Sequence, residues 1–254
     1  MKSPEELARE IFTQRAAFYT TSAAHKDPQT LARLVALAQP LVTWLALDVA
    51  TGTGHTAFAV APYVEQVIAT DITQAMLEEA TKLQHELGQS NIEFRIADVH
   101  QLPFDDASFD LVTSRRAPHH FSDIKRALAE MRRVLKHGGR LVIDDRSAPE
   151  DAHSADIMNK LDWFHDQSHV REYRPSEWRR LLTESGFQIE ALEPYVQQRP
   201  LTSLTRDVSA DHVTSMMELL DSLDTIERDQ FGYRFTDGAP FINHWYVLLS
   251  ATAV

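Results

Sequence analysis

The feature that most constrains the fold is a glycine-containing segment that directly follows a short apolar run. The run covers residues 44–49, and the segment continues as ATGTG at 50–54. Two glycines this close together let the backbone turn sharply and pass near a ligand before a helix begins. The N–H groups at the start of such a helix then face that ligand. The alternative is a tight strand-to-helix turn that holds no ligand.

Apolar runs and helical periodicity alternate along the whole chain. Strand-like runs lie at 44–49, 67–70, 92–96, 109–113, 140–143, 187–192 and 245–251, and helical patterns at 55–62, 73–87, 124–135, 155–166 and 176–185. Strands that alternate with helices predict a parallel sheet with right-handed crossovers. We therefore expect an α/β fold with a doubly wound, mostly parallel seven-stranded sheet.

A helical insertion at about 205–227 separates the last two predicted strands, so the sheet uses both halves of the chain. One domain is therefore expected rather than two. Its expected parts are an N-terminal helical segment at 1–40, a cofactor-binding core at 41–150 and a helical cap on the substrate side at 151–175 and 200–240, all within one domain over 1–254.

Glycine and serine positions predict several helix boundaries. Gly88, Gly138 and Gly186 each follow a helical pattern, and glycine is the usual residue just beyond a helix end. Ser176 precedes another helical pattern, where a serine side chain can cap the first turn. The three glycines are predicted to end three helices, and Ser176 to begin the one that Gly186 ends.

Composition excludes several classes of function. The 254 residues include 37 Asp and Glu against 25 Lys and Arg, which gives a net charge of −12. Such an acidic surface repels phosphate backbones, so no nucleic-acid partner is expected. The absence of cysteine excludes disulfides, cysteine metal ligands and a cysteine nucleophile. Neither a targeting segment nor a membrane span is recognisable, so a cytoplasmic protein is expected.

Three acidic residues follow the first three predicted strands in order: Asp48, Asp71 and Asp98. Gly52-x-Gly54-x-x-Ala57 together with Asp71 fits the dinucleotide fingerprint, in which the acid binds a ribose. An NAD(P)-dependent oxidoreductase is therefore one alternative. Taken singly, each acid also has a structural explanation, as a strand-end acid, a helix cap or a surface loop residue.

S-adenosylmethionine is favoured over NAD by three features outside that fingerprint. Asp48, at the end of the first strand, is placed to support the amino-acid end of the ligand through the loop. Asp98, after the third strand, is placed to accept a hydrogen bond from an adenine amino group. A final strand after a long excursion adds a seventh strand that a plain dinucleotide fold does not need.

The chain from about Trp44 to Pro149 resembles the class I S-adenosylmethionine-dependent methyltransferases, and within them the UbiE/COQ5-like (methyltransferase type 11) group. The resemblance rests on LDVATGTG at 47–54, IATD at 68–71, IADVHQLPF at 96–104, FDLVTSR at 109–115 and RVLKHGGRLVI at 133–143. RRAPHHFSD at 115–123 and SAPED at 147–151 are similar to a bacterial subgroup of small-molecule methyltransferases. Ala50 stands where the family usually has glycine, a mild departure that still permits close approach of a ligand.

The resemblance implies an enzyme of Rossmann-like fold that transfers a methyl group from S-adenosyl-L-methionine to a small-molecule acceptor, with residues 1–40 as a lid. It implies that Asp71 accepts from the ribose hydroxyls and Asp98 from the adenine amino group. The full set of implied cofactor-binding residues is Asp48, Ala50, Thr51, Gly52, Thr53, Asp71, Ile72, Met76, Asp98, Val99, Ser114 and Arg115. A methyltransferase-like binding module without activity is a third alternative.

Methyl transfer from a sulfonium needs mainly alignment and a dry pocket, so no metal is expected. A general base is needed only when the acceptor holds its proton too firmly to lose it unaided. His120, in the loop after the fourth strand, is predicted to be that base; packing of the loop is the alternative. The other candidates on the acceptor side are Arg115, Arg116, His119, Asp144 and Asp145.

Overall fold

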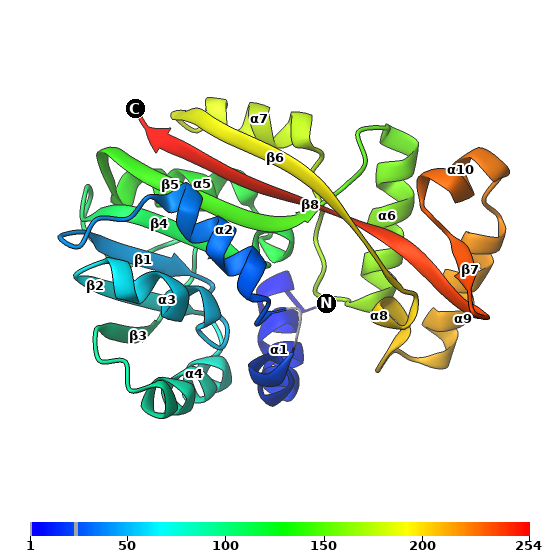
Figure 1. The fold of residues 1–254 in the computed structure, drawn as a ribbon, viewed down its shortest axis with the longest axis horizontal. Helices are drawn as coiled ribbons and strands as arrows, with labels where there is room; N and C mark the ends of the chain where they lie inside the picture. Colours follow the sequence, from blue (N-terminus) through cyan, green and yellow to red (C-terminus); the bar gives the residue numbers. More distant parts are fainter. Residues whose placement is uncertain (1, 23–24) are drawn as a thin grey trace.

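The structure is a computed structural model that describes residues 2–22 and 25–254. In that part of the chain, one sheet runs in the order β3-β2-β1-β4-β5-β8-β6, and a short β7 pairs with β8 off this path (Figure 1). The strands are β1 (Leu45–Val49), β2 (Gln66–Asp71), β3 (Ile92–Ile96), β4 (Phe109–Arg115), β5 (Leu135–Ser147), β6 (Phe187–Pro200), β7 (Arg234–Thr236) and β8 (Ala239–Ala253).

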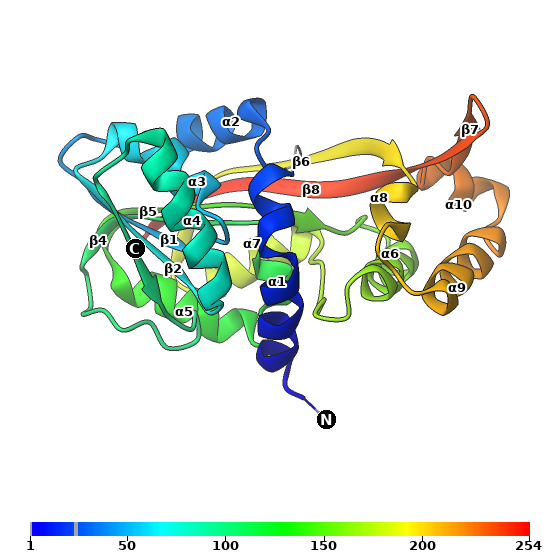
Figure 2. The same ribbon diagram turned by 90° about the horizontal axis from the view of Figure 1, so that it is seen from below.

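Helices cover both faces of this sheet, and Figure 2 shows α2 and α5 on opposite sides of it. The α-helices are α1 (Pro4–Thr21), α2 (Pro28–Ala38), α3 (His55–Val60), α4 (Gln74–Leu87), α5 (Ile124–Val134), α6 (Ala152–His165), α7 (Pro175–Glu184), α8 (Thr202–Thr205), α9 (Ala210–Asp221) and α10 (Thr225–Gln230), and the 3₁₀ turns are η1 (Ala61–Tyr63) and η2 (Pro118–His120). One buried apolar cluster joins α5 and α7 to the sheet, and another joins α2 and α3 to its opposite face. The doubly wound α/β prediction is confirmed.

The five strands β1 to β5 pair in parallel, whereas β8 lies antiparallel between β5 and β6. The sequence predicted only the inner halves of β6 and β8. In the structure the two strands stay paired from Phe187↔Ala253 to Pro200↔Phe241. The outer part of β6 contains Pro194 and several polar residues, which break the apolar alternation that identifies a strand.

Two predicted helix boundaries are wrong. Gly138 does not end a helix: α5 ends at Val134, and the chain passes directly into β5. Gly138 (φ +78°) lies where the register between β4 and β5 shifts, so a bulge explains this glycine. Ser176 lies inside α7, because Pro175 already occupies the first turn. Gly88, by contrast, ends α4 in the left-handed conformation, as predicted.

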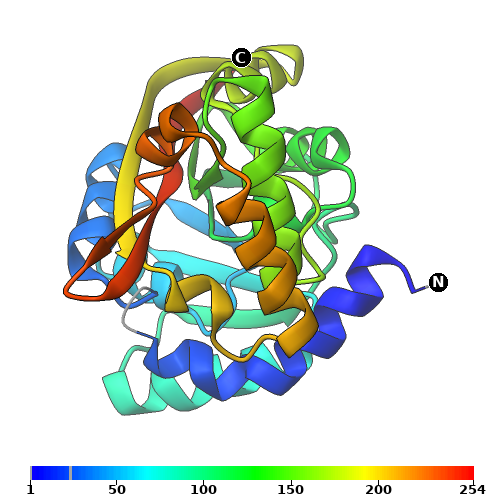
Figure 3. The same ribbon diagram turned by 90° about the vertical axis from the view of Figure 1, so that its right-hand side faces the viewer.

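A third apolar cluster lies outside the sheet, at the far end of the β6–β8 ribbon. It includes Met158 and Leu161 of α6, Met216 and Leu220 of α9, and Phe231. Figure 3 shows the orange helices α9 and α10 beside the green helix α6, which brings segments 50 residues apart in sequence together. The ribbon therefore carries a small helical layer with its own apolar core.

We expect Leu161→Ala to lower the free energy of unfolding by about 2–5 kcal/mol, because it removes a fully buried side chain from this cluster. Urea unfolding followed by circular dichroism measures the change. Lys160→Ala, at an exposed position of the same helix, is the matched control and should stay within about 0.5 kcal/mol. A loss below 0.5 kcal/mol for Leu161→Ala would contradict this packing.

Candidate active site

The carboxyl ends of β1, β2 and β4 open into a cavity of about 1170 Å³. Parallel strands present their carboxyl ends at one edge, where open α/β sheets bind ligands. The cavity is bounded on its other sides by α1, by the segment after α6 and by the start of α8. Ten of the predicted cofactor-binding residues line it: Ala50, Thr51, Gly52, Thr53, Asp71, Ile72, Met76, Asp98, Val99 and Arg115.

The glycine loop after β1 follows its predicted path. Gly52 has φ +55°, and a Cβ built on it would meet nothing within 4 Å, so its backbone is open to the cavity. Gly54 has φ +88°, and a Cβ there would lie 2.8 Å from the ring of Phe58 in α3. One glycine therefore keeps the cavity open and the other lets helix α3 start close to the strand. Ala50 also has a positive φ of 53°.

Asp48 lies beneath the loop rather than in the cavity. Its carboxylate accepts hydrogen bonds from Thr51 Oγ1 at 2.5 Å and from Thr113 Oγ1 at 2.6 Å. Complete burial raises the pKa of Asp48 to about 6. The residue thus ties the loop to β4 and reaches any ligand only through the loop.

Asp71 joins the loop to the start of α4. One of its carboxylate oxygens accepts from the Gly52 N–H and the other from the Thr73 N–H, each at 2.8 Å. Each oxygen keeps a second lone pair that can accept from a ligand hydroxyl. Burial raises the pKa of this carboxyl as well.

Asp98 and Arg115 mark two further walls of the cavity. Asp98 accepts from the His100 N–H at 2.9 Å, and its side chain is 39% exposed. Arg115 donates through Nε to Thr56 at 3.0 Å and through Nη2 to the carbonyl of His25 at 2.5 Å. Its Nη1 is buried and has no hydrogen-bond partner among the described residues.

The expected contact between Ser114 and the cofactor stays a prediction. Ser114 is fully buried and does not line the cavity. Successive residues of a strand point to opposite faces, so Ser114 and Arg115 cannot both face the same space from β4.

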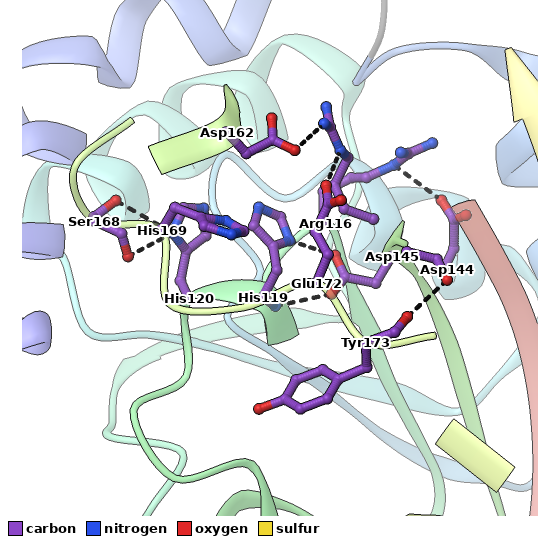
Figure 4. A network of polar contacts seen from close by, with 12 residues as sticks. Arg116, His119, His120, Asp144, Asp145, Asp162, Ser168, His169, Glu172 and Tyr173 are labelled. Carbon is purple, nitrogen blue, oxygen red and sulfur yellow. Dashed lines mark hydrogen bonds and ion pairs between the residues drawn. The ribbon is translucent and has the colours of Figure 1, made fainter. Parts of the chain in front are cut away.

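The ends of β4 and β5 carry a buried polar network on the other side of the cavity (Figure 4). Asp144 accepts from the hydroxyl of Tyr195 at 2.7 Å and lies 3.3 Å from Nε of Arg116. The Arg116 guanidinium lies 3.8 Å from the centre of the Tyr246 ring. These contacts fix a cation and an aromatic face at the base of the cavity.

His119 and His120 form the 3₁₀ turn η2 after β4, and both line the cavity. Nδ1 of His119 lies 2.6 Å from Oδ1 of Asp145, while the His119 backbone N–H donates to Oδ2 at 2.8 Å. Nδ1 of His120 lies 3.1 Å from the carbonyl of Ser168. The two rings are 4.1 Å apart, and Phe12 of α1 meets the His120 ring edge-on at 5.0 Å.

Comparison with known proteins gives consistent matches. A family model described as a methyltransferase domain matches residues 47–143. The uncharacterized methyltransferase YcgJ of Bacillus subtilis is 38% identical over 172 residues, which are 68% of this chain and 68% of that protein. A crystal structure of YcgJ superposes with a TM-score of 0.84 at 32% identity and covers 89% of this chain and 98% of that chain.

The chain belongs to the class I S-adenosylmethionine-dependent methyltransferases. A demethylmenaquinone methyltransferase of Clavibacter sepedonicus is also 41% identical, over 103 residues that make up 41% of each chain. The oxidoreductase alternative receives no support from the family or from these relatives. The antiparallel β8 between β5 and β6 is the additional strand on which the methyltransferase prediction partly rested.

Two structural properties of this methyltransferase concern membrane-spanning helices and metal-binding groups. None of its helices among residues 2–22 and 25–254 combines the length and apolar content that crossing a membrane requires. Within the same residues, no group of three or more His, Asp or Glu side chains is arranged to hold a metal ion.

Sequence reasoning missed the part of the site that the cap contributes. Arg146 at the end of β5 pairs with Asp162 of α6 and, at 2.6 Å, with Glu172. All three side chains are largely buried. The mixed polar and apolar residues around each of them do not indicate this burial. The cap also contributes His169, whose ring lies 5.8 Å from that of His119. No local pattern identifies contacts between segments this far apart.

We expect the stability of the protein relative to an Asp48→Asn variant to fall as pH rises from about 4 to about 6. The folded protein holds a proton on Asp48 up to about pH 6, whereas the unfolded chain releases it near pH 3.9. Within that window the folded state binds more protons, so stability decreases with pH by at most about 1.4 kcal/mol per unit. Urea unfolding of both proteins at pH 4, 5, 6 and 7 measures this. A stability difference between the two proteins that does not change with pH would mean that the pKa of Asp48 is not raised.

Proposed function

We propose that this methyltransferase binds S-adenosyl-L-methionine at the glycine loop and methylates a small-molecule acceptor held between that cofactor and the cap. The observation that carries the proposal is one continuous cavity whose two halves have different linings. One half holds the loop, Asp71 and Asp98; the other holds the histidines of η2 and the cap residues. Its volume lies above the usual range for a single ligand, which favours two ligands side by side.

The residues of the cofactor half fit the chemical groups of S-adenosylmethionine. The free lone pairs of Asp71 suit the ribose hydroxyls, and the partly exposed carboxylate of Asp98 suits an adenine amino group. Ile72 and the buried Met76 supply apolar surface for the adenine ring. The buried Nη1 of Arg115 is an unused donor at the end where the ligand's carboxylate would lie.

The cofactor, when bound, supplies a methyl group that is activated by the positive sulfur. The protein's part is to align the acceptor behind that methyl group and to exclude water. Phe12 and Tyr19 of α1 line the cavity, and His55 of α3 lies 3.2 Å from the carbonyl of Tyr19. We propose that α1 is the lid that shields the transfer, in keeping with the expected role of residues 1–40.

The acceptor half favours a small molecule with both apolar and polar parts. Tyr246 and Phe12 offer ring faces and edges, while Arg146, Arg199 and Asp162 offer charges. The net charge of −12 disfavours a nucleic-acid acceptor. His120 remains a predicted base, and His119 beside it in the same turn is a second candidate.

Isothermal titration calorimetry with S-adenosylmethionine, S-adenosylhomocysteine, NAD and NADP tests the cofactor. We expect both S-adenosyl compounds to bind and both dinucleotides to fail. Tight binding of NAD without binding of S-adenosylhomocysteine would overturn the proposal. Tritium transfer from labelled S-adenosylmethionine into a panel of phenols, thiols and amines then tests methylation itself.

We expect Asp71→Ala to weaken S-adenosylhomocysteine binding by about 30- to 1000-fold. The variant loses charge-assisted hydrogen bonds to a ribose, worth roughly 2–4 kcal/mol. Asp98→Asn should lose less, because an amide oxygen still accepts from adenine. Glu78→Ala, at an exposed position of α4, is the control for expression and folding. Unchanged affinity in a folded Asp71→Ala protein would remove Asp71 from the site.

A further inference from the structure

His119 is distinguished from the other cavity histidines by its partner. The carboxylate of Asp145 is fully buried, and both of its oxygens contact the same residue, one at the His119 backbone N–H and one at ring Nδ1. This two-point contact fixes the ring plane relative to β5. In Figure 4 the imidazole of His119 is held on one edge by Asp145, beside the rings of His120 and His169.

The contact also decides which ring nitrogen carries the proton. Burial raises the pKa of Asp145 to about 7, and the Arg146 backbone N–H and the charge of Arg116 oppose that rise. Once Asp145 is ionised, its carboxylate only accepts, so Nδ1 of a neutral His119 then carries the proton and Nε2 carries a lone pair. His119 lines the cavity, and its Nε2 has no partner among the described residues.

Several charged groups face this ring from the elements packed around it. They are His120 in the same turn, Asp145 and Arg146 on β5, Asp162 on α6, and Asp166 and His169 after α6. Burial, with the nearby Arg146 and His120, holds the pKa of His119 well below its usual range. The ring is therefore neutral near pH 7, as a base must be.

His120 lacks such a partner. Its Nδ1 lies 3.1 Å from the carbonyl and 3.2 Å from the hydroxyl of Ser168, neutral groups that orient the ring but stabilise a charged imidazolium less than a carboxylate does. Oδ1 of Asp166 accepts from the Ser168 N–H at 2.9 Å and from the Ser168 hydroxyl at 2.6 Å, so Ser168 stands between this carboxylate and His120. Phe12 and His119 pack against the two sides of the His120 ring.

We propose that Nε2 of His119 is the atom that receives the acceptor's proton, and that Asp145 is the positioning residue that keeps this atom free. The proposal rests on the proposed methyltransferase function and narrows its substrate class. The acceptor is then a protic group, such as a hydroxyl or phenol, that holds its proton near neutral pH.

The transfer balances with these groups alone. A lone pair of the acceptor oxygen forms the new bond to the methyl carbon, and the methyl–sulfur bond breaks with its electron pair staying on sulfur. The O–H proton passes to Nε2 of His119, and the resulting imidazolium is stabilised by Asp145 through Nδ1–H. Proton loss to solvent after product release restores the neutral ring.

The test reads the ring nitrogens directly, with S-adenosylhomocysteine as the bound probe. Nitrogen-15 NMR spectra of protein labelled with ¹⁵N-histidine are compared for the wild type and three variants: Asp145→Asn, His120→Gln and His119→Gln. The last variant identifies the His119 signals. We expect wild-type His119 to be protonated at Nδ1 and unprotonated at Nε2 above pH 8, where Asp145 is ionised. In Asp145→Asn, the amide oxygen still accepts from the His119 backbone N–H, so the amide NH₂ faces Nδ1. Nδ1 must then accept a hydrogen bond, and the ring proton is expected on Nε2.

A second readout tests access from the cavity. Diethyl pyrocarbonate acylates unprotonated imidazole nitrogens, and peptide mass spectrometry locates each product. We expect His119 to react in wild type and in His120→Gln, and about ten times more slowly in Asp145→Asn. Exposed His85 and His137 are internal standards that should react equally in all variants.

A proton on Nε2 of wild-type His119, or a His119 that does not react while His85 does, would overturn the proposal. An unchanged tautomer in Asp145→Asn would overturn the role of Asp145. Calorimetry with S-adenosylhomocysteine on the same samples distinguishes a failure of the proposed function from a failure of the base assignment. If the probe fails to bind, the proposed function fails; if it binds and Nε2 is protonated, only the assignment of the base fails.

Discussion

The buried carboxylate of Asp48 is the interaction on which the cofactor half of the site depends. It joins the loop hydroxyl of Thr51 to Thr113 on the neighbouring strand β4, and so holds the glycine loop against the sheet. Asp71 then fixes the same loop from β2 through the Gly52 N–H. A glycine loop alone is permissive and adopts many conformations. Two buried acids from adjacent strands restrict it to one, which leaves the free backbone surface of Gly52 facing the cavity.

The acceptor half depends on a different constraint, the long ribbon of β6 and β8. These strands remain paired well beyond the edge of the parallel sheet, so they place the cap helices at a distance from it. The segment after α6 and the start of α8, which directly follows β6, then line the cavity at the carboxyl ends of the parallel strands. The cavity lies between the sheet edge and this helical layer, and its two halves are consequently built by different parts of the chain.

The same division explains what the sequence predicted. The cofactor half is encoded by short continuous motifs at strand ends, and ten of its predicted residues line the cavity. Ser114 does not line the cavity, because strand alternation turns its side chain away from that of Arg115. The pairing of His119 with Asp145 joins residues 26 positions apart, and Arg146 meets Glu172 across the same separation. The first contact follows from the pairing of β4 with β5 and the second from how the cap folds back, and periodicity within a segment describes neither.

The cluster of Arg146, Asp162 and Glu172 shows why the acceptor half cannot be explained by stability alone. Two buried carboxyl groups share one guanidinium, so they cannot both be fully compensated. Burial raises the pKa of Glu172, whereas the charge of Arg146 lowers that of Asp162. A protonated Glu172 beside an ionised Asp162 leaves one neutral ion pair. Buried ion pairs of this kind often contribute less stability than apolar residues of equal volume. Burying these charged groups near His119 nevertheless gives the cavity a rigid polar lining, which apolar residues could not provide.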